Sequence, residues 1–233
     1  MYEEMFMKPL VGWVSGTHLD DLSQRTPKVR DGRTGQMLEN RAVVIHVTLP
    51  EQISANVNIV NLFQQGEGDV LEFTESGFDA NDCLINGQPA SLASYLKDIG
   101  HDLRLPLVAD YNGALINVSL KALDHASGKV AFYGPVFPHV AYKLAQPFSD
   151  SYETAFDIAT TGLPPQAGFS CNCILNYLYS GLEGKRTGDV TGPMTFGEIA
   201  YVLLNQTMVH LTLETHENTP AKCPATAGMQ IID

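Results

Sequence analysis

Two cysteines and one glutamate are the residues whose types and settings best suit chemistry in this sequence. Cys171 and Cys173 are separated by one residue in an apolar stretch, and Glu198 lies within a second apolar stretch. A carboxylate in such a stretch must either point outward or be paired. Two interpretations of Glu198 stay open: an acid at the open end of a strand, or a carboxylate that holds a ligand amine or the side chain of Lys185 or Arg186.

The thiols also allow two interpretations. They are either buried, inert cysteines on a strand, a common place for free cysteine, or part of an enzyme site. In an enzyme Cys171 or Cys173 would be the nucleophile and a histidine, for example His210, its base, which requires a lowered thiol pKa and a base within hydrogen-bond reach. With Cys83 and Cys223 the chain has four cysteines, which do not make a disulfide framework or a zinc site.

The other motifs of enzymes and metal sites are missing from the sequence. The seven histidines are scattered, and none forms the i, i+4 pair of a metalloprotease. The sequence lacks the Gly-x-Ser-x-Gly motif of serine hydrolases and the Gly-Lys-Ser/Thr ending of a phosphate-binding loop. We therefore predict no catalytic residue, no metal site and no cofactor. One alternative is a haem-based gas sensor, because haem needs only one strong axial ligand.

The composition is that of an ordinary globular protein. Of the 233 residues 44% are hydrophobic and 17% charged, and the net charge of −12 disfavours a surface that binds nucleic acid. No stretch approaches the roughly 18 consecutive apolar residues of a membrane helix, and the first ten residues lack the features of a secretory signal. We expect a cytoplasmic protein that binds neither nucleic acid nor membranes.

Alternating and β-branched runs predict a mainly β structure. Strands are expected at residues 11–14, 42–49, 55–63, 69–75, 105–109, 114–120, 129–133, 140–144, 168–177, 195–204 and 207–214. Short connections favour antiparallel pairing of the three strands between residues 42 and 75. The last two strands are expected to form a hairpin that turns at Asn205-Gln206. From His216 onward the pattern is lost, and we expect the chain to run over the surface.

Two helices and one tight turn complete the predicted elements. Apolar residues at helical spacing indicate a helix at residues 90–99, and Ser151 is a candidate N-cap for a second helix. Asn86-Gly87 predicts a tight turn, because both residues accept a positive φ. The fold class is therefore α+β: a core of mixed or antiparallel β-sheet with a few flanking helices.

Several short motifs follow one another in an order known from one family. In the C-terminal third these are Phe169-Ser170-Cys171, Gly192-Pro193-Met194-Thr195-Phe196-Gly197-Glu198-Ile199 and Asn205-Gln206-Thr207-Met208; in the middle they are Leu84-Ile85-Asn86-Gly87-Gln88-Pro89-Ala90, Lys129-Val130-Ala131-Phe132-Tyr133-Gly134 and residues 140–144. Together they resemble the C-terminal half of the FIST sensory domain. The resemblance implies three parts: residues 1–66, similar to the end of the FIST N-terminal half; residues 67–215, a C-terminal FIST-like domain; and a tail at residues 216–233.

The resemblance also implies a function. FIST domains are signal-input modules, so we expect a non-enzymatic domain that binds a small, amino-acid-like ligand and acts through a signalling protein or as a homodimer. Its ligand site is expected in one hollow lined or supported by Cys171, Asn172, Gly197, Glu198, Asn205 and Thr207. The alternatives are the cysteine-dependent enzyme, a haem-based nitric oxide sensor, and a structural subunit whose missing half comes from another chain or from homodimerisation.

Overall fold

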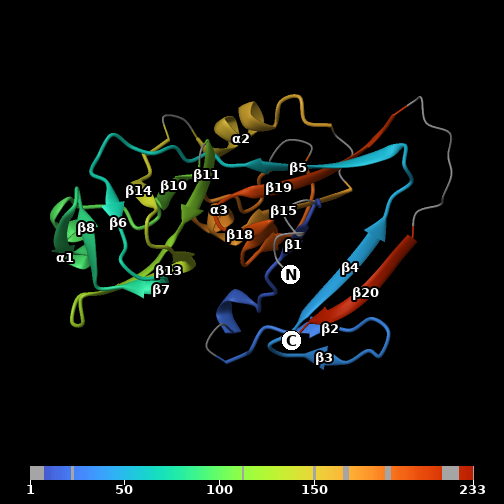
Figure 1. Cartoon of the computed structure of the whole chain (residues 1–233), viewed down its shortest axis with the longest axis horizontal. Helices are drawn as coiled ribbons and strands as arrows, with labels where there is room; N and C mark the ends of the chain where they lie inside the picture. The colour runs from blue at the N-terminus through green and yellow to red at the C-terminus, as the bar shows by residue number, and fades with distance from the viewer. Residues whose placement is uncertain are drawn as a thin grey trace.

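The structure is a computed structural model that describes residues 8–21, 24–111, 113–148, 151–164, 168–186, 190–216 and 226–232. Strands predominate in it and helices are few, as expected for an α+β fold (Figure 1). The elements are β1 (Val11–Trp13), the 3-10 helix η2 (Leu19–Asp21), β2 (Val29–Arg30), β3 (Met37–Leu38), β4 (Ala42–Thr48), β5 (Ile53–Val60), β6 (Leu71–Glu72), β7 (Gly77–Ala80), β8 (Asp82–Ile85), β9 (Gln88–Ser91), α1 (Leu92–Asp98), β10 (Leu107–Tyr111), β11 (Ala114–Val118), β12 (Leu120–Asp124), β13 (Lys129–Val136), β14 (Ala141–Leu144), α2 (Tyr152–Thr160), β15 (Phe169–Cys173), α3 (Ile174–Tyr179), β16 (Met194–Thr195), β17 (Glu198–Ala200), β18 (Val202–Leu204), β19 (Met208–Thr215) and β20 (Thr226–Ile232).

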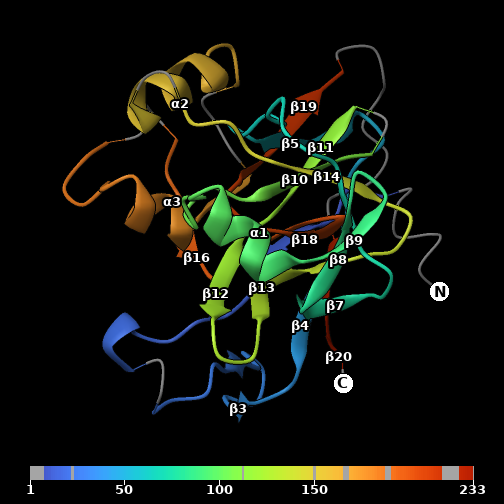
Figure 2. The same cartoon turned by 90° about the vertical axis from the view of Figure 1, so that its left-hand side faces the viewer.

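The middle of the chain, from β6 to β14, folds into two antiparallel sheets around one core. A six-stranded sheet has the order β11-β10-β14-β6-β8-β9, and a three-stranded sheet has the order β12-β13-β7. Helix α1 covers this core with Leu92 and Leu96, and Figure 2 shows the helix in front of the sheets. Phe73 packs edge-to-face against Phe132 and Tyr142, which fills the space between the two sheets.

The C-terminal third forms a second pair of sheets. The four-stranded sheet β16-β15-β19-β5 is mixed, because β15 and β16 are parallel, and the sheet β1-β17-β18 is antiparallel. Neighbouring residues of β19 point to opposite faces, as strand geometry requires. Met208 packs with Tyr152 and Phe156 of α2, whereas Val209 packs with Ala200 and Leu204 of the small sheet. The large sheet therefore lies between α2 and the small sheet.

The local signals in the sequence predicted several elements correctly. Ser151 caps α2, since its Oγ accepts a hydrogen bond of 3.3 Å from the backbone N–H of Thr154. Asn86 and Gly87 adopt φ values of 49° and 79° in the turn between β8 and β9. The predicted helix at residues 90–99 is α1, although the structure places residues 88–91 in β9.

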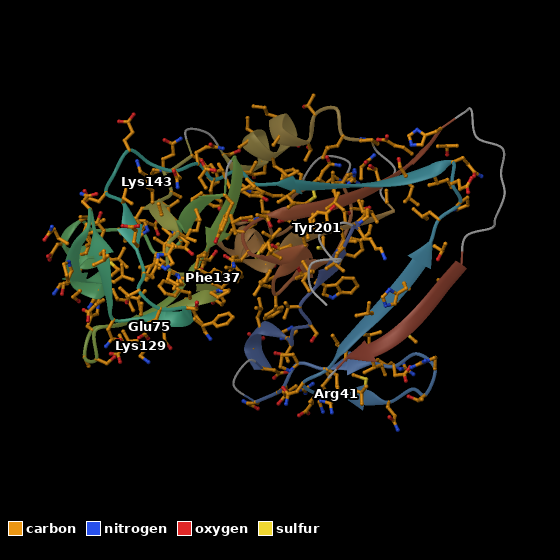
Figure 3. The ribbon with its side chains drawn as sticks, viewed as in Figure 1. Arg41, Glu75, Lys129, Phe137, Lys143 and Tyr201 are labelled. Atoms are coloured by element: carbon orange, nitrogen blue, oxygen red, sulfur yellow. The ribbon has the colours of Figure 1, made fainter. Side chains whose placement is uncertain are left out.

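The predicted strand pairing is wrong in two places. The strands at residues 42–49, 55–63 and 69–75 are not neighbours: β4 pairs with β20, β5 with β19, and β6 with β8 and β14. The hairpin expected to turn at Asn205-Gln206 is also absent from the described residues. Instead β17 and β18 form a hairpin at Tyr201, labelled in Figure 3, and β19 pairs with β15 and β5. Alternation shows which residues share a face but not which strand lies alongside.

Two further segments differ from the prediction. The strand expected at residues 168–177 ends at Cys173, and helix α3 follows, because a short apolar run does not distinguish a strand from a buried helix. Residues 226–232, expected to lack regular structure, form β20.

The boundary implied at residue 66 does not separate one sheet from another, since β1 pairs with β17 and β5 pairs with β19. In the part of the chain that the structure describes, no helix is long and apolar enough to cross a membrane.

Candidate functional site

Glu198 lies at the centre of a buried polar cluster. It begins β17 between Trp13 of β1 and Leu204 of β18, and its side chain is fully buried. Thr195 Oγ1 donates a hydrogen bond of 2.9 Å to one carboxylate oxygen, and Thr207 Oγ1 donates one of 3.1 Å to the other. The acid is therefore held by hydroxyl groups, and neither Lys185 nor Arg186 is its partner; the Lys185 ammonium instead pairs with a carboxylate of α2.

The same cluster sets the protonation of three groups. Burial raises the pKa of Glu198 to about 7, although the hydrogen bonds from the two threonines and from Cys173 act in the opposite direction. Burial, and then the nearby Glu198 carboxylate, raise the pKa of the Cys171 and Cys173 thiols to about 12. A nucleophilic cysteine needs a lowered pKa, so this environment favours inert thiols.

His210 is not placed to be the base of either thiol. Cys171 is paired with Val209 across the sheet, whereas His210 is paired with Ser170. Paired residues share a face and successive residues alternate, so His210 and Cys171 point to opposite faces of the sheet. The His210 ring instead lies 3.1 Å from the carbonyl oxygen of Pro164 through Nε2. His210 is therefore not the base that the cysteine-dependent alternative needs.

Asn172 connects β15 to both neighbouring helices. Its Oδ1 accepts hydrogen bonds from the backbone N–H of Cys173 at 2.8 Å and from Asn176 Nδ2 at 2.9 Å, and its Nδ2 donates to the Tyr152 hydroxyl at 3.2 Å. These partners use both the acceptor and the donor of the side chain. Asn172 thus has the contacts of a structural residue.

The segment between β18 and β19 joins the two groups of sheets. Asn205 Oδ1 accepts a hydrogen bond of 2.7 Å from the backbone N–H of Ser119, and the Ser119 hydroxyl donates one of 2.6 Å to Gln206 Oε1. Gln206 Nε2 donates to the carbonyl oxygen of Arg104 at 3.0 Å. Asn117 Nδ2 lies 3.3 Å from the carbonyl oxygens of both Asn205 and Gln206. We call this set of contacts the clasp.

The structure brings the predicted residues close together but not around a ligand-sized hollow. Cys171 and Glu198 are neighbours, as expected, since β15 and β17 lie in packed sheets. A cavity at these residues measures only about 20 Å³, and of the six predicted residues only Cys171 and Asn172 line it. That is room for a single water. Gly197, at φ 147°, lies 3.2–3.3 Å from the side chains of Leu203 and Val14 at its Cβ position, so its role here is close packing.

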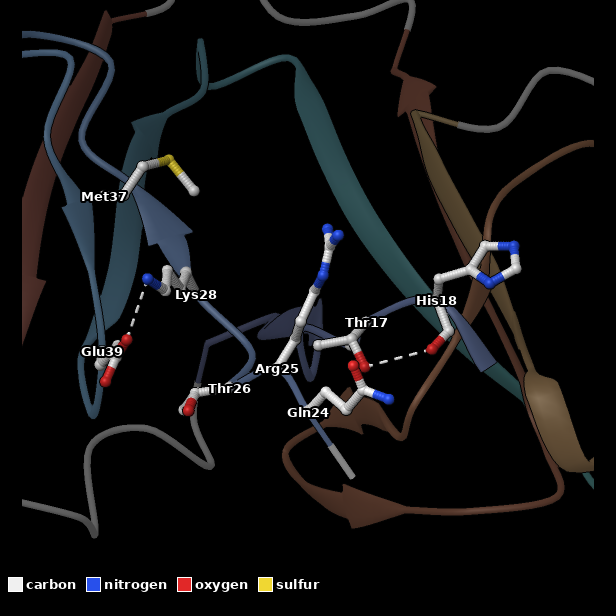
Figure 4. Close-up of a pocket in the computed structure, with 9 residues that line it drawn as sticks. Thr17, His18, Gln24, Arg25, Thr26, Lys28, Met37 and Glu39 are labelled. Atoms are coloured by element: carbon white, nitrogen blue, oxygen red, sulfur yellow. Dashed lines mark hydrogen bonds and ion pairs between the residues drawn. The ribbon is translucent and has the colours of Figure 1, made fainter. Parts of the chain in front are cut away.

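A much larger cavity lies in the N-terminal segment. It measures about 570 Å³ (Figure 4). In Figure 4 the Arg25 side chain lies between the Lys28–Glu39 ion pair on one side and the His18 side chain on the other. The cavity is lined by Gly16, Thr17, His18, Gln24, Arg25, Thr26, Lys28, Met37 and Glu39. Lys28 Nζ lies 3.0 Å from Glu39, and Arg25 Nε lies 3.2 Å from Asp21.

The large cavity adjoins the segment that leads into β17, the strand that begins with Glu198. Gly16, one of its lining residues, lies so close to the Phe196 ring that a Cβ at this position would overlap the ring. Two residues earlier, the backbone N–H of Val14 donates a hydrogen bond of 2.8 Å to the carbonyl oxygen of Gly197. The cavity and the buried acid are thus connected by β1 and residues 196–197.

Comparison with known proteins places the chain in a family. The model of a family of unknown function, DUF6976, matches residues 1–214 of the 233. The chain belongs to the DUF6976 family. The matched range contains the large cavity, the clasp and the Glu198 cluster, whereas β20 follows it. No curated protein and no solved structure matches this DUF6976 chain, so the resemblance to FIST domains stays a prediction.

The sequence held one signal for the large cavity of this DUF6976 protein. Residues 25–41 contain five of the 14 Lys and Arg residues and only two acidic residues, a local charge of +3 in a chain of −12. Apart from this excess of basic residues, the segment has little periodicity and no strong strand or helix pattern. Among the described residues no group of three His, Cys, Asp or Glu side chains is arranged to hold a metal ion.

Proposed function

We propose that the protein is a non-enzymatic sensory domain that binds a small molecule with a carboxylate, such as an amino acid, in the N-terminal cavity. The cavity of about 570 Å³ carries this proposal, because ligand pockets typically measure about 300–1,000 Å³. A domain of this kind acts through a partner protein, as FIST domains do, and the expected compartment is the cytoplasm.

The charges around the cavity favour an anionic group. Arg25 presents a planar guanidinium that suits two parallel hydrogen bonds to a carboxylate, and Lys28 adds a second positive charge. The segment that forms the cavity, residues 16–39, contains four Lys and Arg and four Asp and Glu residues, so it is neutral in a chain whose net charge is −12. Glu39 is an acceptor for the ammonium group of an amino acid.

The connection between the cavity and Glu198 supports a sensory role. A ligand that contacts residues 16–18 acts on Gly16, which packs against Phe196, and through it on β1, which pairs with β17. The raised pKa values of Cys171 and Cys173 and the opposite orientation of His210 argue against the cysteine-dependent enzyme. On this proposal Glu198, Cys171 and Cys173 do not bind the ligand; they stabilise the strands that adjoin the binding cavity.

A thermal-shift titration tests this proposal. Among amino acids, dicarboxylates and inorganic phosphate, we expect an amino acid or a dicarboxylate to raise the melting temperature in a saturable way and by more than phosphate does. A ligand at 100 times its Kd stabilises the folded state by about 2.7 kcal/mol. Arg25→Ala should abolish the shift. The control is Arg104→Ala, because Arg104 also pairs with a neighbouring aspartate at the surface but does not line the cavity.

The same titration can overturn the proposal. A shift that is equal in the wild type and in Arg25→Ala places the ligand elsewhere. No shift with any of the three ligand classes contradicts an anion-binding cavity. Rapid alkylation of Cys171 or Cys173 in the folded protein at pH 7 would favour the cysteine-dependent enzyme instead.

A further inference from the structure

Strands β4 and β20 form a two-stranded ribbon with one entirely aliphatic face. Seven residue pairs join the strands in antiparallel register, and directly paired residues share a face. The ribbon lies at the end of the molecule opposite to α1 in Figure 1, and Arg41 marks its lower end in Figure 3. One face is formed by the pairs Val43–Ile231, Ile45–Met229 and Val47–Ala227.

This aliphatic face is partly open to solvent: Ile45, Val47 and Ala227 are exposed, and the other three side chains are half-buried. Ile45 is 63% exposed and Val47 is 57% exposed, whereas most strands of the fold bury at least one face. A two-stranded ribbon alone in water is at best marginally stable, and stable sheets have a third strand or a packed face. Contiguous exposed aliphatic side chains of this kind mark interaction surfaces.

We propose that the aliphatic face of the ribbon is the interface between two copies of this chain, packed face to face about a two-fold axis. A two-fold interface brings the same surface together from both copies, so it must be complementary to itself. An aliphatic strip meets this condition, because Ile45 and Val47 of one copy pack against the same side chains of the other. This inference is independent of the proposed ligand.

The charge distribution favours a second copy as the occupant. The 14 residues of β4 and β20 include no Asp, Glu, Lys or Arg, although the chain carries a net charge of −12. Two copies therefore meet here without like charges in contact, and exposed edge strands usually carry charges that prevent such contact. A membrane is a poorer partner, because membrane-surface segments carry basic residues and anionic lipids repel an acidic protein.

The size of the ribbon sets the expected strength of the dimer. Seven residues at about 3.4 Å each give a length of about 24 Å, and two strands give a width of roughly 10 Å. This is well below the roughly 800 Å² per partner of a standard stable interface. The dimer should therefore be weak and transient, and its population should depend on the protein concentration.

Sedimentation equilibrium over a concentration series tests the proposal. We expect the apparent mass to rise from 25.4 kDa toward twice that value as the concentration increases. Ile45→Lys should weaken self-association at least tenfold. His46→Lys is the matched control, since it adds the same charge one residue further along β4, on the opposite face of the ribbon. Circular dichroism confirms that each variant is folded.

Cross-linking gives a second test that does not depend on a lysine in the ribbon. With a short thiol cross-linker, Ile45→Cys should form a covalent dimer above the wild-type background, and His46→Cys should not. The proposal is overturned by a constant mass of 25.4 kDa over the whole series, or by equal effects of the two lysine variants. It is also overturned if the protein stays monomeric and binds anionic vesicles through Ile45.

Discussion

The buried Glu198 can satisfy its hydrogen bonds in either protonation state. As a carboxylate it accepts bonds from Thr195 and Thr207. As a neutral acid it can donate to Thr195 Oγ1, whose own hydroxyl can then donate to the carbonyl oxygen of Asn172 at 3.3 Å. Burial favours the neutral acid and raises its pKa to about 7. The folded protein therefore binds a proton that the unfolded chain has already lost at pH 6.

This proton makes the stability of the protein depend on pH. The stabilisation is fully present below the ordinary pKa of 4.5 and is lost as the pH rises through about 7. The two pKa values correspond to a loss on the order of 3 kcal/mol. Glu198→Gln stays neutral, so the free energy of unfolding of this variant should fall less between pH 5 and 8. Urea unfolding at a series of pH values measures the difference.

A glutamate in a different setting supplies the control. Lys185 lies 2.5 Å from Glu153 and lowers the pKa of that carboxyl, so Glu153 is ionised throughout the range from pH 5 to 8. Glu153→Gln should keep the pH dependence of the wild type. If Glu198→Gln also keeps it, the acid does not titrate in this range.

The cysteine thiols give a separate prediction. Cys171 and Cys173 are each only 1% exposed, and their pKa values of about 12 keep them protonated at neutral pH. Iodoacetamide at pH 7.5 should label neither residue in the folded protein and both in urea, as measured by peptide mass spectrometry. Labelling of either in the folded state at the rate of a free thiol would show that the site opens.

At the scale of single elements, capping contributes measurably to stability. Helix α2 begins after Ser151, whose Oγ accepts the hydrogen bond from the backbone N–H of Thr154. Ser151→Ala should lower the free energy of unfolding by about 1 kcal/mol. Ser151→Asp keeps an acceptor at the N-cap and should retain most of the wild-type stability. Equal losses in both variants would mean that the cap contributes little.

Such local signals explain which elements could be predicted from the sequence. The cap at Ser151 and the turn at Asn86-Gly87 depend on neighbouring residues only. Strand partners depend on contacts between distant residues, and the pairing of β4 with β20 joins residues more than 170 positions apart. No local pattern specifies such a pairing, so the connections predicted from short loops were wrong.

The candidate site follows the same division. The nearness of Cys171 and Glu198 could be predicted, because both lie on apolar strands of one segment. The small size of the cavity beside them, about 20 Å³, could not be predicted, since it depends on the contacts of Thr195 and Thr207 with both carboxylate oxygens of the acid. The large cavity needed the fold of residues 16–39, which have little periodicity and no net charge, and only the basic residues between positions 25 and 41 indicated a binding role.

At the scale of the whole molecule, the clasp holds the middle sheets against the C-terminal sheets. Ser119 is fully buried next to β12, and it contacts both Asn205 and Gln206, which lie on the other side of the junction. A buried hydrogen-bonded network of this kind is costly to break in part, because each lost donor leaves an acceptor without water or partner. We therefore expect the clasp to make the two groups of sheets unfold together.

Ser119→Ala tests this coupling. The variant removes the donor to Gln206 Oε1 and leaves that oxygen buried, which should lower the free energy of unfolding by about 1–3 kcal/mol. The control is Ser127→Ala, whose hydroxyl donates to Asp124 in an exposed turn, and which should change the free energy by less than about 0.5 kcal/mol.

Two probes decide whether the sheets unfold together. Trp13 is the single tryptophan, it stacks on Phe169, and its fluorescence reports on the C-terminal sheets, whereas far-ultraviolet circular dichroism follows strands of both groups. In Ser119→Ala the two transitions should shift equally and stay coincident, because the clasp retains its other contacts. If the circular dichroism transition separates from that of Trp13 already in the wild type, the two groups of sheets are independent folding units, and the clasp joins them only weakly.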